Sequence, residues 1–544
     1  KKLSLILLIV MLLSSNLTAY SSDISVQAAA AQQAAVSAGE TASQIESRFP
    51  EEQPTDRLYA QSRRLFKAYK GRGSIIIENH GAEEASVFVN GVSISIEEAL
   101  KEKNGAAVID IGRYTVDGDN TLKVLNIKPE GQYISIKVPY PELISGKPGE
   151  TGFSDEKLAA VDAFINSEVE AGFPGAVLLL LKDGRIIKNT AYGYKLKYHD
   201  GKLLDKFEAM DADTMFDQAS NTKMFATNIA IQKLVSEGKI DVNELVCKYI
   251  PGFTGETREK IKVKDLLTHS AGFASSIRFY LPDNDCGEEF YSHDRSKTLK
   301  LLEKAPLEYP TGTKTIYSDT DYMLLGYIIE NVTGLRLDQY VENNIYKPLG
   351  LKNTVFTPME KGFDKAACAA TEILGNTRGG ERDFPDIRKY TLQGEVHDEK
   401  AYYSMGGVSG HAGLFSTASD MAVLCQLMLN QGGYGDIKIF GKNVWDQFTK
   451  PSDNDITFGL GWNRAGNGDK IWQFGPYAGN TVVGHTGWTG TLTVIDPEND
   501  MAIVLLTNKK HSAGVGDSFE GDKFETGKYG SIVSLIYEAL LERP

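Results

Sequence analysis

The sequence predicts an α+β fold, in which an antiparallel sheet is flanked by helices, with a small β-sandwich-like module before it. The run "GAVLLLLKDGRIIKNTAYGY" is typical of a β-hairpin that turns at Asp183 and Gly184. Near the C-terminus, "TLTVID" and "MAIVLLTN" flank "PEND" as a second hairpin. Helical patterns occupy much of the chain between the two hairpins. This order of elements indicates helices packed on an antiparallel sheet, not a doubly wound parallel sheet.

Helices are expected before, between and after these hairpins. Ser154 is a candidate N-cap for the first helix, which has Asp155 and Glu156 in its first turn and Gly172 just past its end. The other expected helices cover roughly 221–238, 319–332, 416–430 and 530–542.

The N-terminus has the pattern of a secretory signal peptide, assigned to residues 1–30. Lys1 and Lys2 precede an apolar run from Leu3 to Leu13, and small polar residues follow. The sequence therefore predicts a secreted or extracytoplasmic protein of the bacterial cell envelope. A membrane tether is expected only if this segment stays uncleaved, because the apolar run is short for a membrane span.

Three further regions follow the signal peptide. Residues 31–72 are predicted to be a linker or tether. Residues 73–145 contain short alternating runs separated by turn signals such as Asn90-Gly91, and they predict a β-rich accessory module. This module carries no catalytic constellation, so a spacer or docking role stands beside direct ligand binding. Residues 150–544 form the predicted catalytic domain.

Composition limits the functions to consider. The formal net charge is −14, from 58 basic and 72 acidic residues, and an acidic chain without a basic cluster argues against a nucleic-acid partner. The four cysteines are widely separated and show no zinc-ligand spacing, so neither a metal site nor a cofactor is expected.

The stretch "DQASNTKMFA" places Ser220 and Lys223 three residues apart at the start of an expected helix. A serine hydroxyl is a weak nucleophile until a neighbouring base takes its proton. At a helix N-terminus, free N–H groups would favour developing negative charge. Taken alone, the pattern favours a helix-capping serine with a solvent-exposed lysine over a catalytic pair.

Two later segments favour catalysis over capping. "TIYSDTDYMLLG" contains Tyr317 and Asp319, and "VVGHTGWTGTLTVID" contains His485, Thr486 and Gly487. Ser-x-x-Lys, then Tyr-x-Asn/Asp, then Lys/His-Thr-Gly resembles the class C β-lactamase and penicillin-binding DD-peptidase family, which also contains esterases. The resemblance covers about residues 155–540. It implies a β-lactamase/transpeptidase-like fold with a separate all-helical subdomain.

The resemblance implies a role for each motif residue. Ser220 would attack a carbonyl and become an acyl-enzyme, with the backbone N–H groups of Ser220 and Trp488 as oxyanion donors. Lys223 and Tyr317 would share the proton transfers, and either could be the base. Lys223 is expected to lower the Tyr317 pKa from about 10. His485 and Thr486 would hold a substrate carboxylate or carbonyl, while the strand through Gly487 pairs with the substrate backbone.

Two departures from the family pattern bear on specificity. The usual third residue of the middle motif is Asn, which donates to a substrate amide carbonyl, whereas ionised Asp319 only accepts. Asp319 is expected to pair with Lys223 and to raise the Tyr317 pKa. His485 stands where many β-lactamases have Lys, which weakens the fixed positive charge for a β-lactam carboxylate. Both departures favour a peptidase or esterase over a β-lactamase.

A long polar segment between about 361 and 410 contains "GEVHDEKA". Loops of this length often line functional sites, so His397 or Asp398 is a candidate substrate contact. A solvated loop held by its own hydrogen bonds is the alternative. Of the other histidines, His269 is expected to be packed near the cleft and His511 to lie at the surface.

Together these features predict an exported serine acyl hydrolase. Its expected substrate is a peptidoglycan-type peptide cleaved in the manner of a DD-carboxypeptidase. An ester or a β-lactam substrate is the alternative, which would make the chain an esterase or a class C-type β-lactamase. A sensor that is acylated without turnover is the alternative of another class.

Overall fold

The structure is a computed structural model that describes residues 56–58 and 62–540, except 103, 104, 285, 467 and 517. The predicted signal peptide and most of the predicted linker lie outside these residues. The helices within the described residues include none that is long and apolar enough to cross a membrane.

A central antiparallel sheet joins the two predicted hairpins. Its strand order is β12-β11-β10-β23-β22-β21-β20, with the short β9 parallel to β11 at its side. The N-terminal hairpin turns at Asp183 and Gly184, both with positive φ, and its strand β10 pairs with β23 of the C-terminal hairpin. The α+β prediction is confirmed. The strands are β9 (Ile144–Ser145), β10 (Gly175–Lys182), β11 (Arg185–His199), β12 (Lys202–Ala209), β20 (Asn463–Arg464), β21 (Val483–Gly487), β22 (Thr491–Asp496) and β23 (Met501–Thr507).

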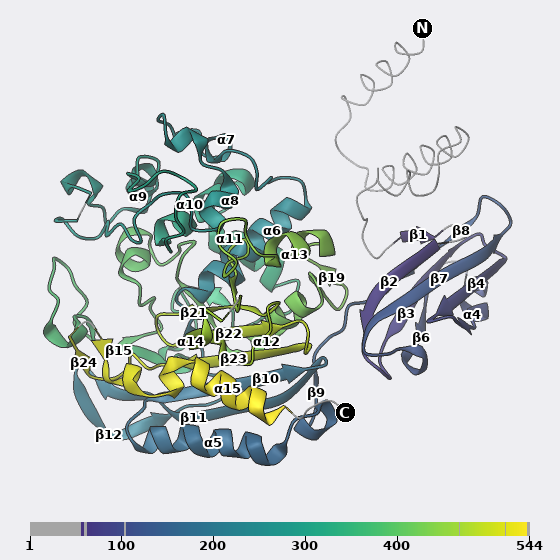
Figure 1. Ribbon diagram of the computed structural model, residues 1–544, viewed down its shortest axis with the longest axis horizontal. Coiled ribbons are helices and arrows are strands. Elements are labelled where there is room, and N and C mark those ends of the chain that lie inside the picture. The colour runs from purple at the N-terminus through teal and green to yellow at the C-terminus, as the bar shows by residue number, and fades with distance from the viewer. Residues whose placement is uncertain are drawn as a thin grey trace, which may run out of the picture. The chain divides into compact units, whose positions relative to one another are not determined.

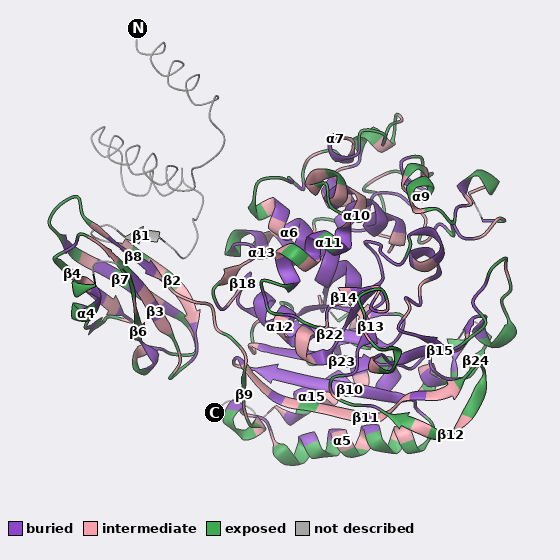
Figure 2. Cartoon of the chain, turned by 180° about the vertical axis from the view of Figure 1, so that it is seen from behind, coloured by how far each residue is buried: buried purple, intermediate pink, exposed green. Residues whose placement is uncertain are grey.

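Helices cover both faces of this sheet, which explains the unbroken apolar run of β10. Leu178 and Leu180 pack in one core with α5 (Asp155–Glu170) and α15 (Gly530–Ala539), which lie against each other (Figure 1). Leu179 and Leu181 face the opposite core, which includes α12 (Ala418–Leu429). Every residue of β10 is buried (Figure 2), because alternate side chains enter two different cores.

The helical part of the domain lies between the two hairpins in sequence. The predicted helices at 319–332 and 416–430 are confirmed as α10 and α12. The helix expected at 221–238 starts as a π-helical segment, Lys223–Asn228, and continues as α6. Such π-helical turns are frequent at functional sites. Besides α12, the helices of this part are α6 (Ile229–Ser236), α7 (Val246–Tyr249), α8 (Val263–Leu267), α9 (Arg295–Leu302), α10 (Asp319–Thr333), α11 (Leu337–Val341), α13 (Lys442–Thr449) and α14 (Ile471–Phe474).

Several small sheets connect these parts. A three-stranded sheet has the order β13-β17-β14, and its strand β13 lies directly before Ser220 in the chain; three further strand pairs lie in the connections. These strands are β13 (Phe216–Asp217), β14 (Val355–Phe356), β15 (Ala370–Asn376), β16 (Leu392–Gln393), β17 (Leu414–Ser416), β18 (Gly433–Tyr434), β19 (Ile437–Lys438), β24 (Gly514–Val515) and β25 (Ser518–Phe519).

The β-rich module consists of two four-stranded sheets around one apolar core, with orders β1-β8-β3-β6 and β2-β7-β4-β5. Its strand β2 falls inside the range predicted as linker, so that boundary is wrong. The side chains of "SRRLFKA" alternate between more and less exposed positions, and the charged ones hid the strand pattern. The elements are β1 (Asp56–Leu58), β2 (Ser62–Ala68), β3 (Ser74–His80), β4 (Glu84–Val89), β5 (Val92–Ile94), α4 (Glu97–Lys101), β6 (Ala106–Asp110), β7 (Gly118–Lys128) and β8 (Tyr133–Lys137).

Candidate active site

Ser220 is a partly exposed residue between two fully buried stretches, at the turn that joins β13 to the π-helical segment. The residue before it, Ala219, has a φ of 45°, a backbone conformation that is uncommon outside glycine. The Ala219 N–H donates to Asp217 Oδ1 at 2.8 Å, which holds this turn in place. The local fold therefore presents one hydroxyl to the surface from an otherwise closed segment.

Lys223 lies one turn below Ser220 and is completely buried. Its Nζ is 3.0 Å from Ser220 Oγ, 2.8 Å from Asp319 Oδ1 and 3.1 Å from the His411 carbonyl oxygen. An ammonium group has three protons, and these three acceptors match them. Burial lowers the pKa of Lys223, but Asp319 and Tyr317 outweigh burial and the net pKa is raised. Lys223 is therefore held as a cation against the serine oxygen.

Tyr317 precedes α10 and lies over the same lysine, with 4.8 Å between Lys223 Nζ and the centre of its ring. Hydrogen bonds to Lys223 and Ser220 act to lower the pKa of its hydroxyl. Burial raises this pKa by more than those contacts lower it, and Asp319 raises it further. The opposing effects expected of Lys223 and Asp319 are both present, and the net pKa is raised because desolvation of the phenolate outweighs the nearby cation.

His485 lies on β21 beside this phenol, with 5.9 Å between the two ring centres. Burial and the charge of Lys223 lower the pKa of His485 to about 3. Its Nδ1 is 2.7 Å from the Thr486 carbonyl oxygen, so Nδ1 carries the proton and donates. Nε2 is buried, has no partner among the described residues, and presents a lone pair. A neutral ring with an accepting Nε2 does not suit the predicted role of holding a carboxylate.

The end of β21 and the start of β22 are both bound tightly to the turn that carries Ser220. Thr491 Oγ1 donates to the Gln218 carbonyl oxygen at 3.0 Å, and Asn221 Nδ2 donates to Thr491 Oγ1 at 3.0 Å. A Cβ on Gly487 would lie 2.5 Å from the Gln218 carbonyl oxygen, so only glycine permits this approach.

This contact brings the two predicted oxyanion donors close together. Among the described residues, the N–H groups of Ser220 and Trp488 donate to no protein acceptor. Two free N–H groups on adjoining segments are what an oxyanion hole requires. Thr486, between His485 and Gly487, is partly exposed on the same strand.

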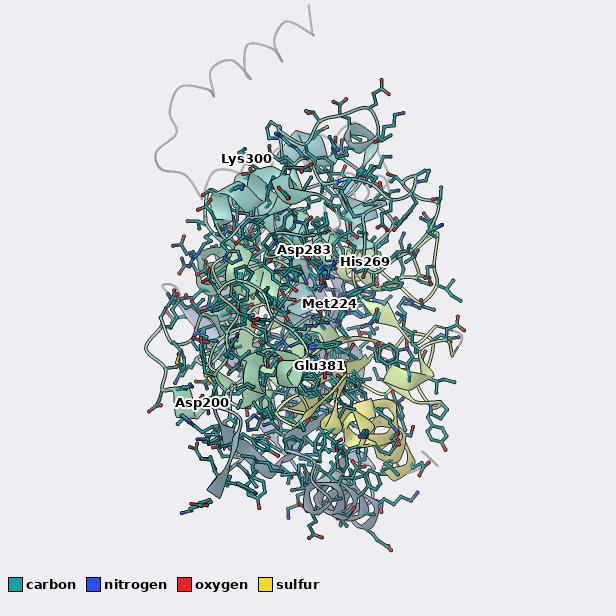
Figure 3. The ribbon with its side chains drawn as sticks, turned by 90° about the vertical axis from the view of Figure 1, so that its left-hand side faces the viewer. Asp200, Met224, His269, Asp283, Lys300 and Glu381 are labelled. Carbon is teal, nitrogen blue, oxygen red and sulfur yellow. The ribbon has the colours of Figure 1, made fainter. Side chains whose placement is uncertain are left out.

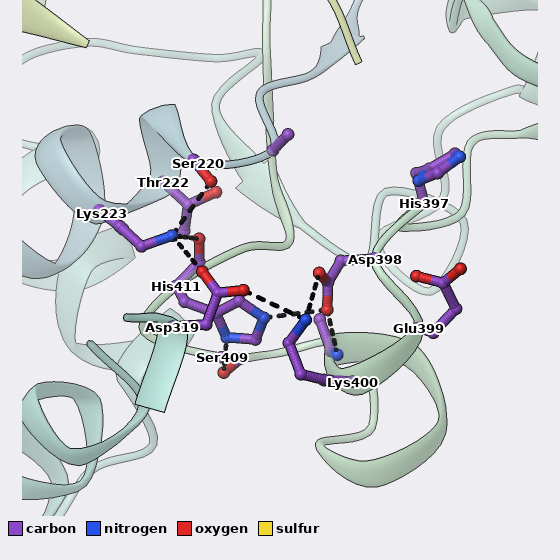
Figure 4. Close-up of polar contacts among 12 residues, drawn as sticks. Ser220, Thr222, Lys223, Asp319, His397, Asp398, Glu399, Lys400, Ser409 and His411 are labelled. Atoms are coloured by element: carbon purple, nitrogen blue, oxygen red, sulfur yellow. Dashed lines mark hydrogen bonds and ion pairs between the residues drawn. The ribbon is translucent and has the colours of Figure 1, made fainter. Parts of the chain in front are cut away.

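The segment between 361 and 410 contributes a buried chain of charges behind the serine (Figure 4). Lys400 Nζ bridges two carboxylates, at 3.1 Å from Asp319 Oδ2 and 3.2 Å from Asp398 Oδ2. Asp398 Oδ1 is 2.9 Å from His411 Nε2. This set, which we call the nucleophile cluster, comprises Ser220, Lys223, Asp319, Asp398, Lys400 and His411.

The electrostatics of the nucleophile cluster stabilise its ionised forms. Burial raises the pKa of Asp319, but Lys223 and Lys400 outweigh burial and lower it. Asp398 behaves in the same way, because Lys400 and His411 lower its pKa well below the usual value. Asp319, Asp398 and His411 also place ligand atoms within 4.8 Å of one another. The two lysine ammonium groups already neutralise these carboxylates, so the donor set is an ion-pair network and does not fit a divalent cation.

His397 belongs to a second buried group. The ring Nε2 of His397 is 2.8 Å from Glu372 Oε2, and the backbone N–H of His397 donates to Asp217 Oδ2. Arg378 pairs with Glu372 and, at 2.7 Å, with Glu399. We call Glu372, Arg378, His397 and Glu399 the Glu372 cluster. In Figure 4, His397 and Glu399 lie apart from the residues joined to Ser220.

Two of the histidines outside these clusters, His269 and His511, are buried. His269 is packed as expected, with its ring centre 4.6 Å from that of Tyr317 and its Nδ1 3.1 Å from Asp321 Oδ2; it is labelled in Figure 3 with Met224, from the turn after Ser220. His511, expected at the surface, is fully buried. Its Nε2 accepts from the Lys197 N–H at 2.8 Å, so the polar stretch around it misled the prediction.

Sequence reasoning missed Lys400 and gave His411 no role. Lys400 had no signal beyond its place in the charged run "HDEKA". His411 follows "MGGVSG", and only its contact with Asp398 connects it to the site.

Comparison with known proteins assigns the chain to the same family as its three motifs do. Residues 159–521 match the family described as Beta-lactamase. The chain is 53% identical over 411 residues to a Bacillus subtilis protein named N-acetylmuramyl-L-alanine amidase, with 74% of this chain and 92% of that protein covered. It is 51% identical over 414 residues to a Salmonella typhi protein named "Putative D-alanyl-D-alanine carboxypeptidase", covering 74% and 95%.

Solved structures support the fold assignment. A penicillin-binding protein homologue from Caulobacter crescentus matches with a TM-score of 0.51 and 19% identity, covering 72% of this chain and 99% of that one. The D-amino acid amidase of Ochrobactrum anthropi SV3 matches with a TM-score of 0.51 and 19% identity, covering 71% and 99%.

Proposed function

Because the chain belongs to the Beta-lactamase family, we propose that it is an active-site serine amide hydrolase that forms an acyl-enzyme at Ser220. The proposed substrate is an N-acetylmuramyl peptide, a fragment of peptidoglycan. The bond cleaved is the amide between the D-lactyl group of the sugar and L-alanine. The Bacillus subtilis relative, matched over 92% of its length, is named for this amide. The D-alanyl-D-alanine bond, the first expectation from the sequence, becomes the second candidate.

The two amides resemble each other at the reacting carbonyl. In each, the carbonyl carbon is bonded to an α-carbon of D configuration that carries a methyl group. They differ at the next atom, which is an amide nitrogen in an acylated D-alanine and an ether oxygen in the lactyl group. A site that accepts one acyl group therefore needs little change to accept the other, and recognition of the next atom decides between them.

Asp319 is the observation that favours the lactyl amide. An Asn in this position would donate to the amide carbonyl that precedes a D-alanine acyl group. The Asp319 carboxylate cannot donate, and its two oxygens face Lys223 Nζ at 2.8 Å and Lys400 Nζ at 3.1 Å. An ether-linked acyl group has no carbonyl at that place, so it leaves no acceptor unsatisfied when the donor is missing.

The proposed reaction passes protons through Tyr317 in a concerted relay. Ser220 Oγ bonds to the lactyl carbonyl carbon while its proton passes to the Tyr317 oxygen and the Tyr317 proton passes to the amide nitrogen. The C–N bond breaks and the peptide leaves as a neutral amine. Because the Tyr317 proton departs as the serine proton arrives, no free phenolate is needed despite its raised pKa. Water then cleaves the ester by the reverse proton path.

Lys223 and the backbone donors stabilise the charge that develops. The Lys223 ammonium, 3.0 Å from Ser220 Oγ, attracts the negative charge on the serine and tyrosine oxygens. The N–H groups of Ser220 and Trp488 would bind the carbonyl oxygen as it becomes an oxyanion.

Hydrolysis of N-acetylmuramyl-L-alanyl-D-isoglutamine tests the proposal. We expect N-acetylmuramic acid and L-alanyl-D-isoglutamine, identified by liquid chromatography and mass spectrometry. The matched control is Ser220→Ala, which should lower kcat at least about 1,000-fold with an unchanged circular dichroism spectrum. Failure of the folded wild type to cleave this amide would disprove the proposed substrate, and turnover by Ser220→Ala would disprove the nucleophile.

Carboxypeptidase activity on D-alanyl-D-alanine is the second candidate, and Lys470 favours it. Its Nζ donates to Asn463 Oδ1 at 3.0 Å and lies 3.9 Å from the centre of the Phe458 ring. Its charge reaches the site, since it lowers the pKa of His485. Lys470 could therefore bind a terminal carboxylate. Release of D-alanine from N-acyl-D-alanyl-D-alanine, with loss of that release in Lys470→Met, would support this activity.

We also propose that the protein acts outside the cytoplasm, where peptidoglycan fragments are found. The support is the signal-like pattern of residues 1–30. N-terminal sequencing of protein recovered from the envelope or medium should find a new N-terminus after Ala19 or between about residues 28 and 31. Recovery only from the cytoplasm would contradict the proposal.

A further inference from the structure

We propose that Trp488 forms the binding platform for the sugar ring of the N-acetylmuramyl group. This inference rests on the proposed function and names the part of the protein that recognises the acyl side of that substrate. The indole would stack against the carbon–hydrogen face of the pyranose ring. A planar aromatic ring of this kind buries a large area at a small cost in side-chain entropy.

Trp488 is half exposed between two buried neighbours. Its side chain is 50% exposed, while Thr489 after it is 1% exposed and Gly487 before it is buried. Thr489 Oγ1 donates to the Asp217 carbonyl oxygen at 2.7 Å, so the backbone around the indole is anchored to the turn that carries Ser220. The half-exposed indole is therefore held at a fixed place next to the turn of Ser220, where a bound acyl group would meet it.

The indole is braced on one face. Lys510 Nζ lies 3.9 Å from the ring centre of Trp488, and the lysine is only 3% exposed. Asp522 holds this ammonium with oxygens at 3.0 and 2.8 Å. Asp522 also pairs with Lys509 at 3.1 Å, so one carboxylate holds two lysines behind the ring. This support fixes the indole from one side, and its exposed part remains for a ligand.

The position of the platform matches the chemistry of the acyl group. In the lactyl ether, only the α-carbon and the ether oxygen separate the reacting carbonyl carbon from the sugar ring, a span of about 4 Å for three bonds. The Trp488 N–H would bind the carbonyl oxygen at about 2.9 Å. A sugar ring so close to that carbonyl comes within reach of the side chain of the same residue.

A comparison of two substrates tests the platform. One is N-acetylmuramyl-L-alanyl-D-isoglutamine, and the other is D-lactoyl-L-alanyl-D-isoglutamine, which has the same scissile amide and no sugar. Trp488→Ala should lower kcat/KM about tenfold for the first substrate, the scale of an aromatic stacking contact. For the second, the change should stay below about twofold, because the backbone N–H is retained. Trp488→Phe should recover most of the loss.

The control variant is Trp472→Ala, on α14, since Trp472 is similarly exposed at 53%. It should leave both reactions unchanged. Equal losses on both substrates in Trp488→Ala would overturn the platform, because they would show that the indole acts only on the shared amide.

Binding provides a readout that does not need turnover. We expect Ser220→Ala to bind N-acetylmuramyl-L-alanyl-D-isoglutamine, with a Kd about tenfold higher when Trp488→Ala is added. An unchanged Kd would overturn the platform. Absence of cleavage by the wild type, together with this tenfold loss of binding, would disprove the proposed reaction and retain the sugar site.

Discussion

The nucleophile cluster and the Glu372 cluster are two buried sets of opposite charges in the same domain. They differ in whether they include a residue that is partly exposed. The first ends at Ser220, which is partly exposed. In the second, Glu372, Arg378, His397 and Glu399 are all at most 7% exposed, and they bond to one another. Both satisfy the rule that buried charges are paired. The difference is that only the first network contacts a partly exposed hydroxyl, which is why we propose a chemical role for it and a structural role for the second.

Asp319→Asn, in the nucleophile cluster, should show the largest difference in activity between mutating this cluster and mutating the Glu372 cluster. The change removes the negative charge between Lys223 and Lys400 while keeping the shape of the side chain. We expect kcat on the N-acetylmuramyl amide to fall about 100-fold, because Lys223 loses the partner that holds it charged and in place. The amide group would also restore the donor that Asp319 lacks.

The same variant sharpens the choice of substrate. Its kcat/KM on an N-acyl-D-alanyl amide, relative to the lactyl amide, should rise. Kinetics on the two substrates side by side measure this ratio. A ratio equal to that of the wild type would show that residue 319 does not discriminate between the two acyl groups.

Glu372→Gln should affect stability instead of chemistry. It leaves Arg378 and His397 without their shared carboxylate, and breaking a buried ion pair from one side costs about 3 kcal/mol. We expect a lower midpoint in urea unfolding, with kcat/KM of the remaining folded enzyme within about threefold of wild type. The conservative control is Glu372→Asp. A loss of kcat as large as that of Asp319→Asn would show that the two clusters act as one.

The pH dependence should be the smallest effect, and it tests the charge state of His485. Because its folded-state pKa is about 3, the ring stays neutral over the working range, and kcat/KM should show no inflection near 6.5 that belongs to it. His485→Gln should leave the shape of the profile between pH 5 and 8 unchanged. Loss of an inflection near 6.5 in that variant would contradict a neutral His485.

The stability effect of His485 has a definite sign. Between about pH 3 and the ordinary value near 6.5, the unfolded chain binds a proton at this residue and the folded chain does not. The free energy of unfolding should therefore fall as the pH falls through this range. His511, whose pKa burial also lowers to about 3, acts in the same direction, and urea unfolding at pH 5 and 7 measures the sum.

Local patterns predicted the elements well. The hairpin at Asp183 and Gly184 and helices α5, α10 and α12 follow from turn residues, caps and apolar spacing, which act over a few neighbouring residues. Strand β2 was missed because Arg63, Arg64 and Lys67 interrupt its apolar residues, so the apolar alternation was weak. Serine, tyrosine and histidine motifs identified the three candidate segments.

By itself, the sequence determined the fold class, the order of the elements and the candidate segments around Ser220, Tyr317 and His485. Only the tertiary structure decided how these groups are charged. Lys400 reaches Asp319 across about eighty residues of chain, and burial sets the pKa directions of Tyr317 and His485. The physical reason is range: propensity and periodicity are local, while desolvation and ion pairing depend on whatever the fold brings within a few ångströms.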